Sequence, residues 1–177
     1  MIIDLDNYYI DPIQEKDAWK ICDFAVANAD RLKRFFPKTL EQNTTPTLSK
    51  IFTKKKVKQY EAQEEFLFTL KEKETNDMVG LIYLKELDWD KKIGEFAYCI
   101  GYPFEGKGLI SKSTKALSAY AINNLGLKTL QIIVHKSNLR SAKVAEKCGF
   151  VWQRTLSNEF TPPNELPLDM ELYELYQ

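Results

Sequence analysis

The sequence contains few of the residues on which several classes of protein depend. It has one histidine, His135, and three widely separated cysteines, Cys22, Cys99 and Cys148. Neither a Cys/His zinc cluster nor a disulfide framework is therefore expected. The 25 basic and 25 acidic residues balance, so no net charge draws the protein to nucleic acid or to an anionic membrane. We expect no metal site, no nucleic-acid partner and no membrane partner.

The sequence also lacks the apolar segments that carry a protein to or across a membrane. No stretch approaches the roughly 20 apolar residues of a spanning helix. The start, MIIDLDNYYI, carries two aspartates and no basic region of the kind that opens a signal peptide. Unpaired cysteines suit a reducing compartment. Together these features predict a cytoplasmic protein.

The composition is that of a folded globule. Hydrophobic residues make up 44% of the chain, which has only seven glycines and seven prolines, and this balance argues against disorder. A chain of 177 residues buries enough apolar surface to fold as one unit. We predict a single domain spanning residues 1–177.

Apolar periodicity predicts a strand and two helices in the first third of the chain. The strand is expected at Tyr8–Ile13 and an amphipathic helix at Glu15–Phe36. Pro37 is predicted to stop this helix. A second helix is expected over Thr45–Ala62, which begins with a favourable Thr-Pro start. Its basic run KKKVK (Lys54–Lys58) is interpreted as a solvated face, with contact to an acidic partner as the alternative.

The rest of the chain predicts an α/β fold of the α+β type, with a mixed, mostly antiparallel sheet of about seven strands flanked by four helices. The pattern changes after the second helix to runs rich in aromatic and β-branched residues, separated by turn residues. The expected elements are strands at 65–74, 78–87 and 92–102, a helix at 108–126, a strand at 129–136, a helix at 138–149, and strands at 151–156 and 168–175.

Two of the seven glycines stand directly before a predicted helix, in the stretch FEGKGLISKS (Phe104–Ser113). A helix N-terminus leaves about four backbone N–H groups without intrahelical partners and carries partial positive charge. Glycines let a ligand approach the backbone closely, so the pattern is typical of a phosphate or pyrophosphate site. An ordinary glycine turn has the same local sequence. The stretch is neither a Walker P-loop nor a Rossmann fingerprint.

A second motif, HKSNLRSAKVAEKCGF (His135–Phe150), follows the next predicted strand. The pair, GKG before one helix and NxxS opening the next, resembles the GNAT superfamily of acyl-CoA-dependent N-acetyltransferases. Within it, the match resembles the RimJ/RimL-type ribosomal-protein alanine and serine N-terminal acetyltransferases. The specific part covers Gly94–Trp152, about a third of the chain. The resemblance implies a GNAT-like fold whose sheet splays between its fourth and fifth strands.

The resemblance also implies acetyl-CoA as cosubstrate. The amides of Glu105–Ile110 match the segment that cradles the CoA pyrophosphate, and the strand end Tyr98–Ile100 matches the one that bonds the pantetheine. Asn138 is implied to contact the pantetheine arm or to fix the loop beside it. The family pattern Q/R-x-x-G-x-G/A differs here at both ends, which are Glu105 and Ile110. The expected coenzyme-binding residues are Cys99, Ile100, Gly101, Glu105, Gly106, Lys107, Gly108, Leu109, Ile110, Ser111, Asn138 and Ser141.

Direct transfer to a primary amine requires a base for the amine and a proton for the leaving thiolate. Glu95 matches the glutamate of the family's ELGYW strand and is predicted as base; an exposed position at a sheet edge is the alternative. Many relatives place a tyrosine acid where this chain has Ala145. Ser141 is predicted as the proton donor, with Tyr98 or water as alternatives, or it bonds only backbone. Cys99 is interpreted as a small strand residue.

Three interpretations of the whole chain follow. The first is an N-acetyltransferase whose acceptor is a protein N-terminal alanine or serine, or a small amine. A CoA-binding sensor or accessory module without catalysis is the second, and Glu105 and Ala145 support it. The third is a structural α/β protein that binds no CoA. We expect the acceptor cleft to be formed by Glu15–Ala62 and by the loop before the last strand. The sequence leaves monomer and homodimer open.

Overall fold

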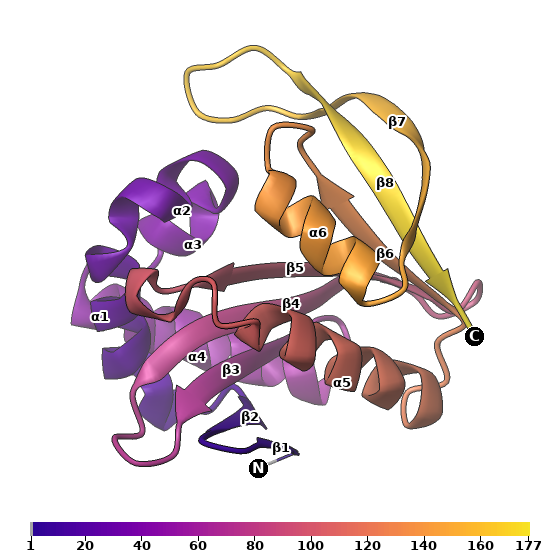
Figure 1. Ribbon diagram of the computed structural model, residues 1–177. Helices are drawn as coiled ribbons and strands as arrows, with labels where there is room; N and C mark the ends of the chain where they lie inside the picture. The colour runs from indigo at the N-terminus through magenta and orange to yellow at the C-terminus, as the bar shows by residue number, and fades with distance from the viewer. Residues whose placement is uncertain (1) are drawn as a thin grey trace. The chain divides into compact units, whose positions relative to one another are not determined.

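The computed structural model describes residues 2–177, and its strands form one mixed sheet in the order β1-β2-β3-β4-β5-β6-β8-β7 (Figure 1). This confirms the predicted α/β fold, with β1 added to the expected strands. The strands are β1 (Ile3–Leu5), β2 (Tyr8–Pro12), β3 (Phe66–Glu72), β4 (Met78–Asp88), β5 (Ile93–Ile100), β6 (Thr129–Val134), β7 (Val151–Phe160) and β8 (Leu168–Tyr176). The helices are η1 (Glu15–Asp17), α1 (Ala18–Ala27), α2 (Ala29–Phe35), α3 (Pro37–Glu41), α4 (Pro46–Glu61), η2 (Tyr102–Phe104), α5 (Leu109–Asn123) and α6 (Leu139–Lys147).

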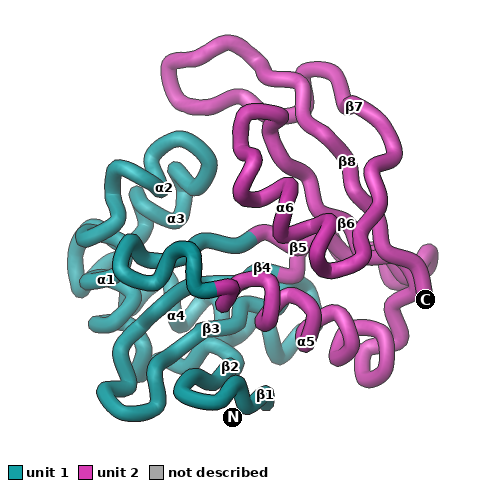
Figure 2. The backbone as a smooth tube through the Cα atoms, in the orientation of Figure 1, with its two compact units in different colours: residues 1–83, 98–107 teal, residues 84–97, 108–177 magenta. Residues whose placement is uncertain are grey.

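The chain forms two compact units (Figure 2). Unit 1 comprises the chain up to Tyr83 together with Tyr98–Lys107, and unit 2 comprises Leu84–Ala97 and Gly108–Gln177. Strands β4 and β5 each pass from one unit into the other along the chain. The predicted site residues are therefore distributed over both units. That residues 1–177 act as one domain stays a prediction.

The region Glu15–Phe36 does not form the single helix that was predicted. It is divided into η1, α1 and α2, and the main break falls at Asn28, which has φ −115° and ψ 22°. The Asn28 side chain donates to the Phe24 carbonyl at 2.8 Å and accepts from the Tyr102 amide at 3.1 Å. Asparagine side chains that bond nearby backbone compete with helix formation, so α1 ends here.

Helix α2 ends at Phe35, before Pro37, as predicted, and Pro37 also begins a helix of its own. It lies in the first turn of α3, where the missing N–H would have no intrahelical acceptor. The second predicted helix is confirmed as α4, and Thr45 is its N-cap. The Thr45 side chain accepts a hydrogen bond from the Leu48 amide at 3.3 Å.

Part of the core of unit 1 lies where α4 packs on β3. The ring of Tyr60 on α4 stands edge-on to Phe66 and Phe68, with centroid distances of 4.9 and 5.7 Å. Strand β3 is buried along nearly its whole length. Both of its faces are therefore covered, which explains why its sequence, FLFTLKE, does not alternate between apolar and polar residues.

A buried ion pair joins η1 to β3 in the same unit. Lys71 Nζ lies 2.6 Å from Asp17 Oδ1, and each side chain is only 2% exposed. The other Asp17 oxygen accepts from the Gln14 amide at 3.0 Å. Charges so completely removed from water are tolerated only when they are paired and hydrogen-bonded, so each partner depends on the other.

The sheet of unit 2 is built around β6. Strand β5 pairs with it in parallel, from Ile93 with Thr129 to Phe96 with Ile132, while β8 pairs antiparallel with both β6 and β7. Strand β7 is longer than the sequence indicated: it was predicted to end at residue 156 and continues to Phe160. The splay predicted between the fourth and fifth strands stays a prediction.

The two helices of unit 2 are followed by glycines, as predicted. Gly126 after α5 has φ 73° and Gly149 after α6 has φ 88°, the left-handed conformation that favours glycine. The amide of Leu127 donates to the Ala121 carbonyl at 3.1 Å, which satisfies one of the last carbonyls of α5. The two helix ends thus have the cap geometry that the local sequence predicted.

Candidate active site

The turn before α5 has the backbone conformation of an anion site. Gly106 and Gly108 have φ of 74° and 72°, whereas Glu105 before them has φ −63°. A run in which φ alternates in sign turns successive N–H groups toward one side. A Cβ added at either glycine would meet no atom within 4 Å. The backbone conformation, rather than packing, therefore requires glycine, and the space beside the turn is open.

The backbone amides around this turn differ in what they already bond. The amides of Phe104 and Glu105 donate to the carbonyls of Gly101 and Tyr102, at 3.0 and 3.3 Å. The following amides, Gly106–Ile110, have no protein acceptor within residues 2–177, as expected at a helix N-terminus. They are thus the amides available to an anion, whereas the Glu105 amide already has a partner.

The side chains of the turn leave its backbone accessible. Leu109 and Ile110 are buried, at 5% and 6% exposure, so the isoleucine that departs from the family pattern packs into the core. Lys107 is exposed, and its Nζ lies 5.2 Å from the centroid of the Phe104 ring. The Ser111 carbonyl accepts a hydrogen bond from Cys148 Sγ at 3.3 Å.

Glu105 is paired with a residue that the sequence did not single out. Arg31 Nη2, from α2, donates to Glu105 Oε1, and the guanidinium lies over the Tyr102 ring, 4.4 Å from its centroid. The Arg31 and Glu105 side chains are each 23% exposed. Arg31 stands in the run ADRLKRFF, where nothing marks one basic residue over its neighbours.

The end of β5 holds the predicted pantetheine-binding residues in unit 1. Tyr98, Cys99 and Ile100 are half-buried, and the Gly101 amide after them donates to the Val79 carbonyl at 2.9 Å. Burial raises the pKa of the Cys99 thiol to about 12. A thiol that stays protonated is a poor nucleophile, which agrees with the interpretation of Cys99 as a strand residue.

Glu95 lies on β5 in unit 2 and is paired with Lys85 of β4. Lys85 Nζ is 2.9 Å from Glu95 Oε1, and the glutamate side chain is 13% exposed. Burial raises the pKa of the Glu95 carboxyl, Lys85 opposes this, and the carboxylates of Glu86 and Glu159 raise the pKa further. Strand β5 lies between β4 and β6, so the alternative of an exposed sheet edge is wrong.

Asn138 caps α6, in unit 2. Its Oδ1 accepts a hydrogen bond from the Ser141 amide at 3.2 Å, and its own amide donates to the His135 carbonyl at 2.8 Å. These bonds give a structural basis for the second implied role of Asn138, fixing the loop. Ser141 is half-buried in the first turn of α6, and Ala145 is fully buried.

Each unit thus carries part of the predicted site. Unit 1 holds the residues from Tyr98 to Lys107, and unit 2 holds Glu95, Gly108–Ser111, Asn138 and Ser141. Within the units, the structure joins Glu95 to Lys85 and Asn138 to Ser141. The sequence singled out neither Lys85 nor Arg31, because each is distinguished only by its ion pair with a glutamate on another element.

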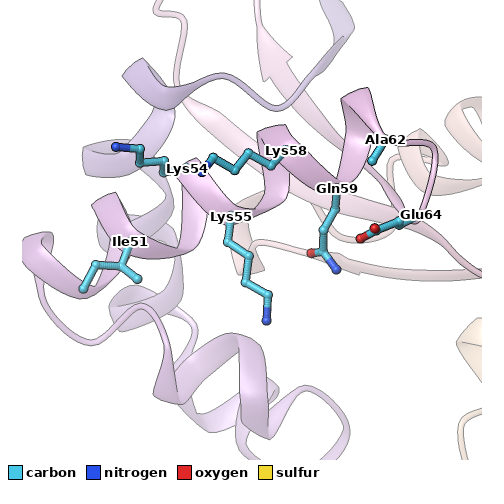
Figure 3. A pocket seen from close by; sticks show the side chains of 7 residues that line it. All are labelled: Ile51, Lys54, Lys55, Lys58, Gln59, Ala62 and Glu64. Atoms are coloured by element: carbon cyan, nitrogen blue, oxygen red, sulfur yellow. The ribbon is translucent and has the colours of Figure 1, made fainter.

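The basic run of α4 lines a shallow hollow on unit 1 (Figure 3). Lys54, Lys55 and Lys58 are exposed, as predicted for a solvated face. Lys56 differs, because its Nζ bonds Glu65 Oε1 at 2.5 Å. The hollow is lined by Ile51, Lys54, Lys55, Lys58, Gln59, Ala62 and Glu64. Within residues 2–177, no helix is long and apolar enough to span a membrane, and no cluster of three or more metal-ligating side chains occurs.

The sequence matches the family model described as the acetyltransferase (GNAT) domain over residues 8–151. This range includes the glycine turn, Glu95 and α6, and it covers most of the chain. The protein therefore belongs to the GNAT acetyltransferase family, which confirms the resemblance drawn from the two motifs.

Curated relatives come from two kinds of acetyltransferase. "Putative ribosomal N-acetyltransferase YdaF" of Bacillus subtilis is 35% identical over 74 residues, 42% of this chain and 40% of the relative. "Spermidine N(1)-acetyltransferase" of Escherichia coli K12 is 31% identical over 84 residues, 48% of this chain and 45% of the relative. The matched segments thus span less than half the length of either relative.

Solved structures confirm the fold over nearly the whole chain. A ribosomal-protein-S5-alanine acetyltransferase from Vibrio fischeri superposes with a TM-score of 0.91 at 19% identity, covering 98% of this chain and 95% of the other. A RimL ribosomal L7/L12 α-N-protein acetyltransferase, solved with coenzyme A, gives 0.89 at 15% identity, covering 99% and 97%. The fold is therefore that of the RimJ/RimL-type structures.

Proposed function

We propose that residues 1–177 act as one acetyltransferase domain, which moves an acetyl group from acetyl-CoA directly to a primary amine. The open glycine turn before α5 carries this proposal, since it offers the backbone amides of Gly106–Ile110 to an anion. Family membership supports the same chemistry. The acceptor is a protein N-terminal alanine or serine, or a small amine. The relatives' names include a ribosomal N-acetyltransferase and a spermidine acetyltransferase. We place the protein in the cytoplasm, as a monomer or homodimer.

The residues of the turn fit the diphosphate of coenzyme A. Helix N-termini and glycine turns bind phosphate groups through backbone N–H donors and the helix dipole. Lys107, exposed beside these amides, adds a positive charge. The end of β5 and the Asn138 side chain are proposed to contact the pantetheine arm, which supplies the thioester that the amine attacks.

Two side chains are proposed to transfer protons in the chemical step, one as a base and one as an acid. Glu95 takes a proton from the acceptor ammonium, directly or through water, so that the neutral amine attacks the thioester carbonyl carbon. The carbon–sulfur bond then breaks, and the Ser141 hydroxyl gives a proton to the departing thiolate. The nitrogen of the new amide loses its second proton in the same step, and this proton restores the Ser141 hydroxyl. The raised pKa of Glu95 supports the first role, because a stronger base accepts a proton more readily near neutral pH.

Replacing Glu95 with glutamine is expected to lower kcat/KM at least about tenfold near neutral pH. Only the ionised carboxylate accepts a proton, so wild-type activity falls as the pH drops through the raised pKa of Glu95. Above the pKa of the acceptor amine the substrate is already neutral, so the kcat/KM of Glu95→Gln should approach that of wild type. The pH profile of kcat/KM measures both limits, and equal rates at every pH would assign Glu95 to structure.

Lys85→Met provides the matched control for this profile. Lys85 lowers the pKa of Glu95, so its removal should move the acidic limb of the profile to higher pH and leave the alkaline plateau unchanged. If the acidic limb does not move, it reports some group other than Glu95.

Ser141→Ala is expected to lower kcat at least about tenfold, since assistance by a general acid is usually worth about 10² to 10⁴ in rate. Coenzyme affinity should stay within a few fold, because the Ser141 amide still bonds Asn138 Oδ1. Tyr98→Phe should have a much smaller effect. Steady-state kinetics of both variants give kcat, and calorimetry gives their affinities for the coenzyme. If Tyr98→Phe lowers kcat more than Ser141→Ala does, Tyr98 is the proton donor.

Release of CoA thiol with a panel of amines and peptide N-termini tests the proposed function itself. An acetyltransferase releases thiol only when an acceptor is present. A sensor or accessory module binds CoA, as calorimetry would show, but releases none with any acceptor. A protein with a merely structural turn does not bind CoA at all.

A further inference from the structure

The turn proposed to bind a diphosphate begins with a negatively charged residue. Glu105 directly precedes Gly106, and its side chain is three-quarters buried, with 23% exposure. Like charges repel strongly where water is partly excluded. An unpaired carboxylate at this position would weaken the binding of any anion at the following amides.

Arg31 forms an ion pair with Glu105 and so compensates the negative charge of its carboxylate. Its Nη2 donates to the Glu105 carboxylate, and its guanidinium stacks on Tyr102, which lies three residues before Glu105 in the chain. Within residues 2–177, Glu105 is the only carboxylate paired with Arg31, and Arg31 Nη1 is buried without a hydrogen-bond partner. The positive charge of Arg31 is therefore directed to Glu105.

The break between α1 and α2 fixes the position of Arg31 relative to the turn. Asn28, one helical turn before Arg31, accepts a hydrogen bond from the Tyr102 amide. A Cβ added at Gly101 would lie 3.6 Å from the Phe24 ring of α1, so the start of η2 also packs closely against this region. Helix α2 and the segment leading into the turn thus form one connected structure inside unit 1.

We propose that Arg31 is a positioning residue for coenzyme binding, which neutralises Glu105 and holds its carboxylate away from the diphosphate. Arg31 thereby supplies from α2 the positive charge that the first position of the turn lacks in this sequence. This inference rests on the proposed function, because it assumes that the turn binds coenzyme A.

The test measures CoA binding by calorimetry for wild type, Arg31→Met, Glu105→Gln and the double variant. Methionine keeps an apolar stem over Tyr102 but removes the charge. Arg31→Met is expected to raise the dissociation constant at least about fivefold. The loss should shrink at high salt, because salt partly screens the repulsion between the carboxylate and the diphosphate. Glu105→Gln should stay within about threefold of wild type. The double variant should return to the same range, because no carboxylate remains to repel the diphosphate.

Two results would overturn the inference. One is an Arg31→Met protein that binds CoA as wild type does. The other is a double variant as weak as Arg31→Met, since Arg31 would then act through structure or direct contact rather than through Glu105. Thermal unfolding checks that each variant is folded, and Arg31→Gln takes the place of Arg31→Met if that protein does not fold. A wild-type protein that fails to bind CoA would instead refute the proposed function.

Discussion

Replacing Gly108 with aspartate is expected to raise the dissociation constant for CoA at least about a hundredfold. Gly108 is the N-cap of α5, has φ 72°, and borders open space. A carboxylate there enters the region proposed for the diphosphate, where charge repulsion at short range costs several kcal/mol, and about 1.4 kcal/mol corresponds to a factor of ten. Calorimetric titration with CoA measures the loss.

Gly108→Asn is the control for this variant. Asparagine has nearly the same size as aspartate and is also tolerated in the left-handed conformation, so the two variants share any cost in backbone strain. We expect the asparagine protein to lose less than about tenfold in affinity. Equal losses in the two proteins would mean that the backbone, rather than an anion site, explains the effect.

Replacing Lys71 with methionine is expected to lower the free energy of unfolding by about 3–5 kcal/mol. The substitution leaves the Asp17 carboxylate buried without its 2.6 Å partner, in a position where the side chain is 2% exposed. Methionine fills most of the space of the lysine stem, so packing changes little. Urea denaturation followed by circular dichroism measures the difference.

The double variant Lys71→Met/Asp17→Asn separates charge from packing. Asparagine keeps an oxygen that accepts from the Gln14 amide but carries no charge, so the double variant should recover more than half of the lost stability. If it is as unstable as Lys71→Met, the lysine contributes through its packing in β3, and the buried charge is not the cause.

The sequence predicted best those features that are decided within a few residues. The glycines at 106, 108, 126 and 149 all adopt positive φ, because turn and cap geometry depends on local conformation. Asn138 opens α6 and Thr45 opens α4 through their own side chains. The two motifs that indicated the GNAT family are built from the same kind of local signal.

The features that were wrong or missed depend on partners far away in the chain. Asn28 interrupts the expected first helix, and its side chain bonds both the nearby Phe24 carbonyl and the Tyr102 amide, 74 positions later. Arg31 acquires its partner Glu105 over the same separation, and Lys85 meets Glu95 on a neighbouring strand. Periodicity cannot reveal such pairs, since each residue alone fits an ordinary helix or strand.

The state of the cysteines has a practical consequence for following turnover. The Cys99 thiol has its pKa raised to about 12, the pKa of Cys148 is also raised, and Cys22 is buried. Disulfide reagents react with thiolates, and burial also denies them access. We therefore expect the protein's own sulfhydryl groups to react slowly with a colorimetric disulfide, so that this reagent can follow the coenzyme A released during catalysis.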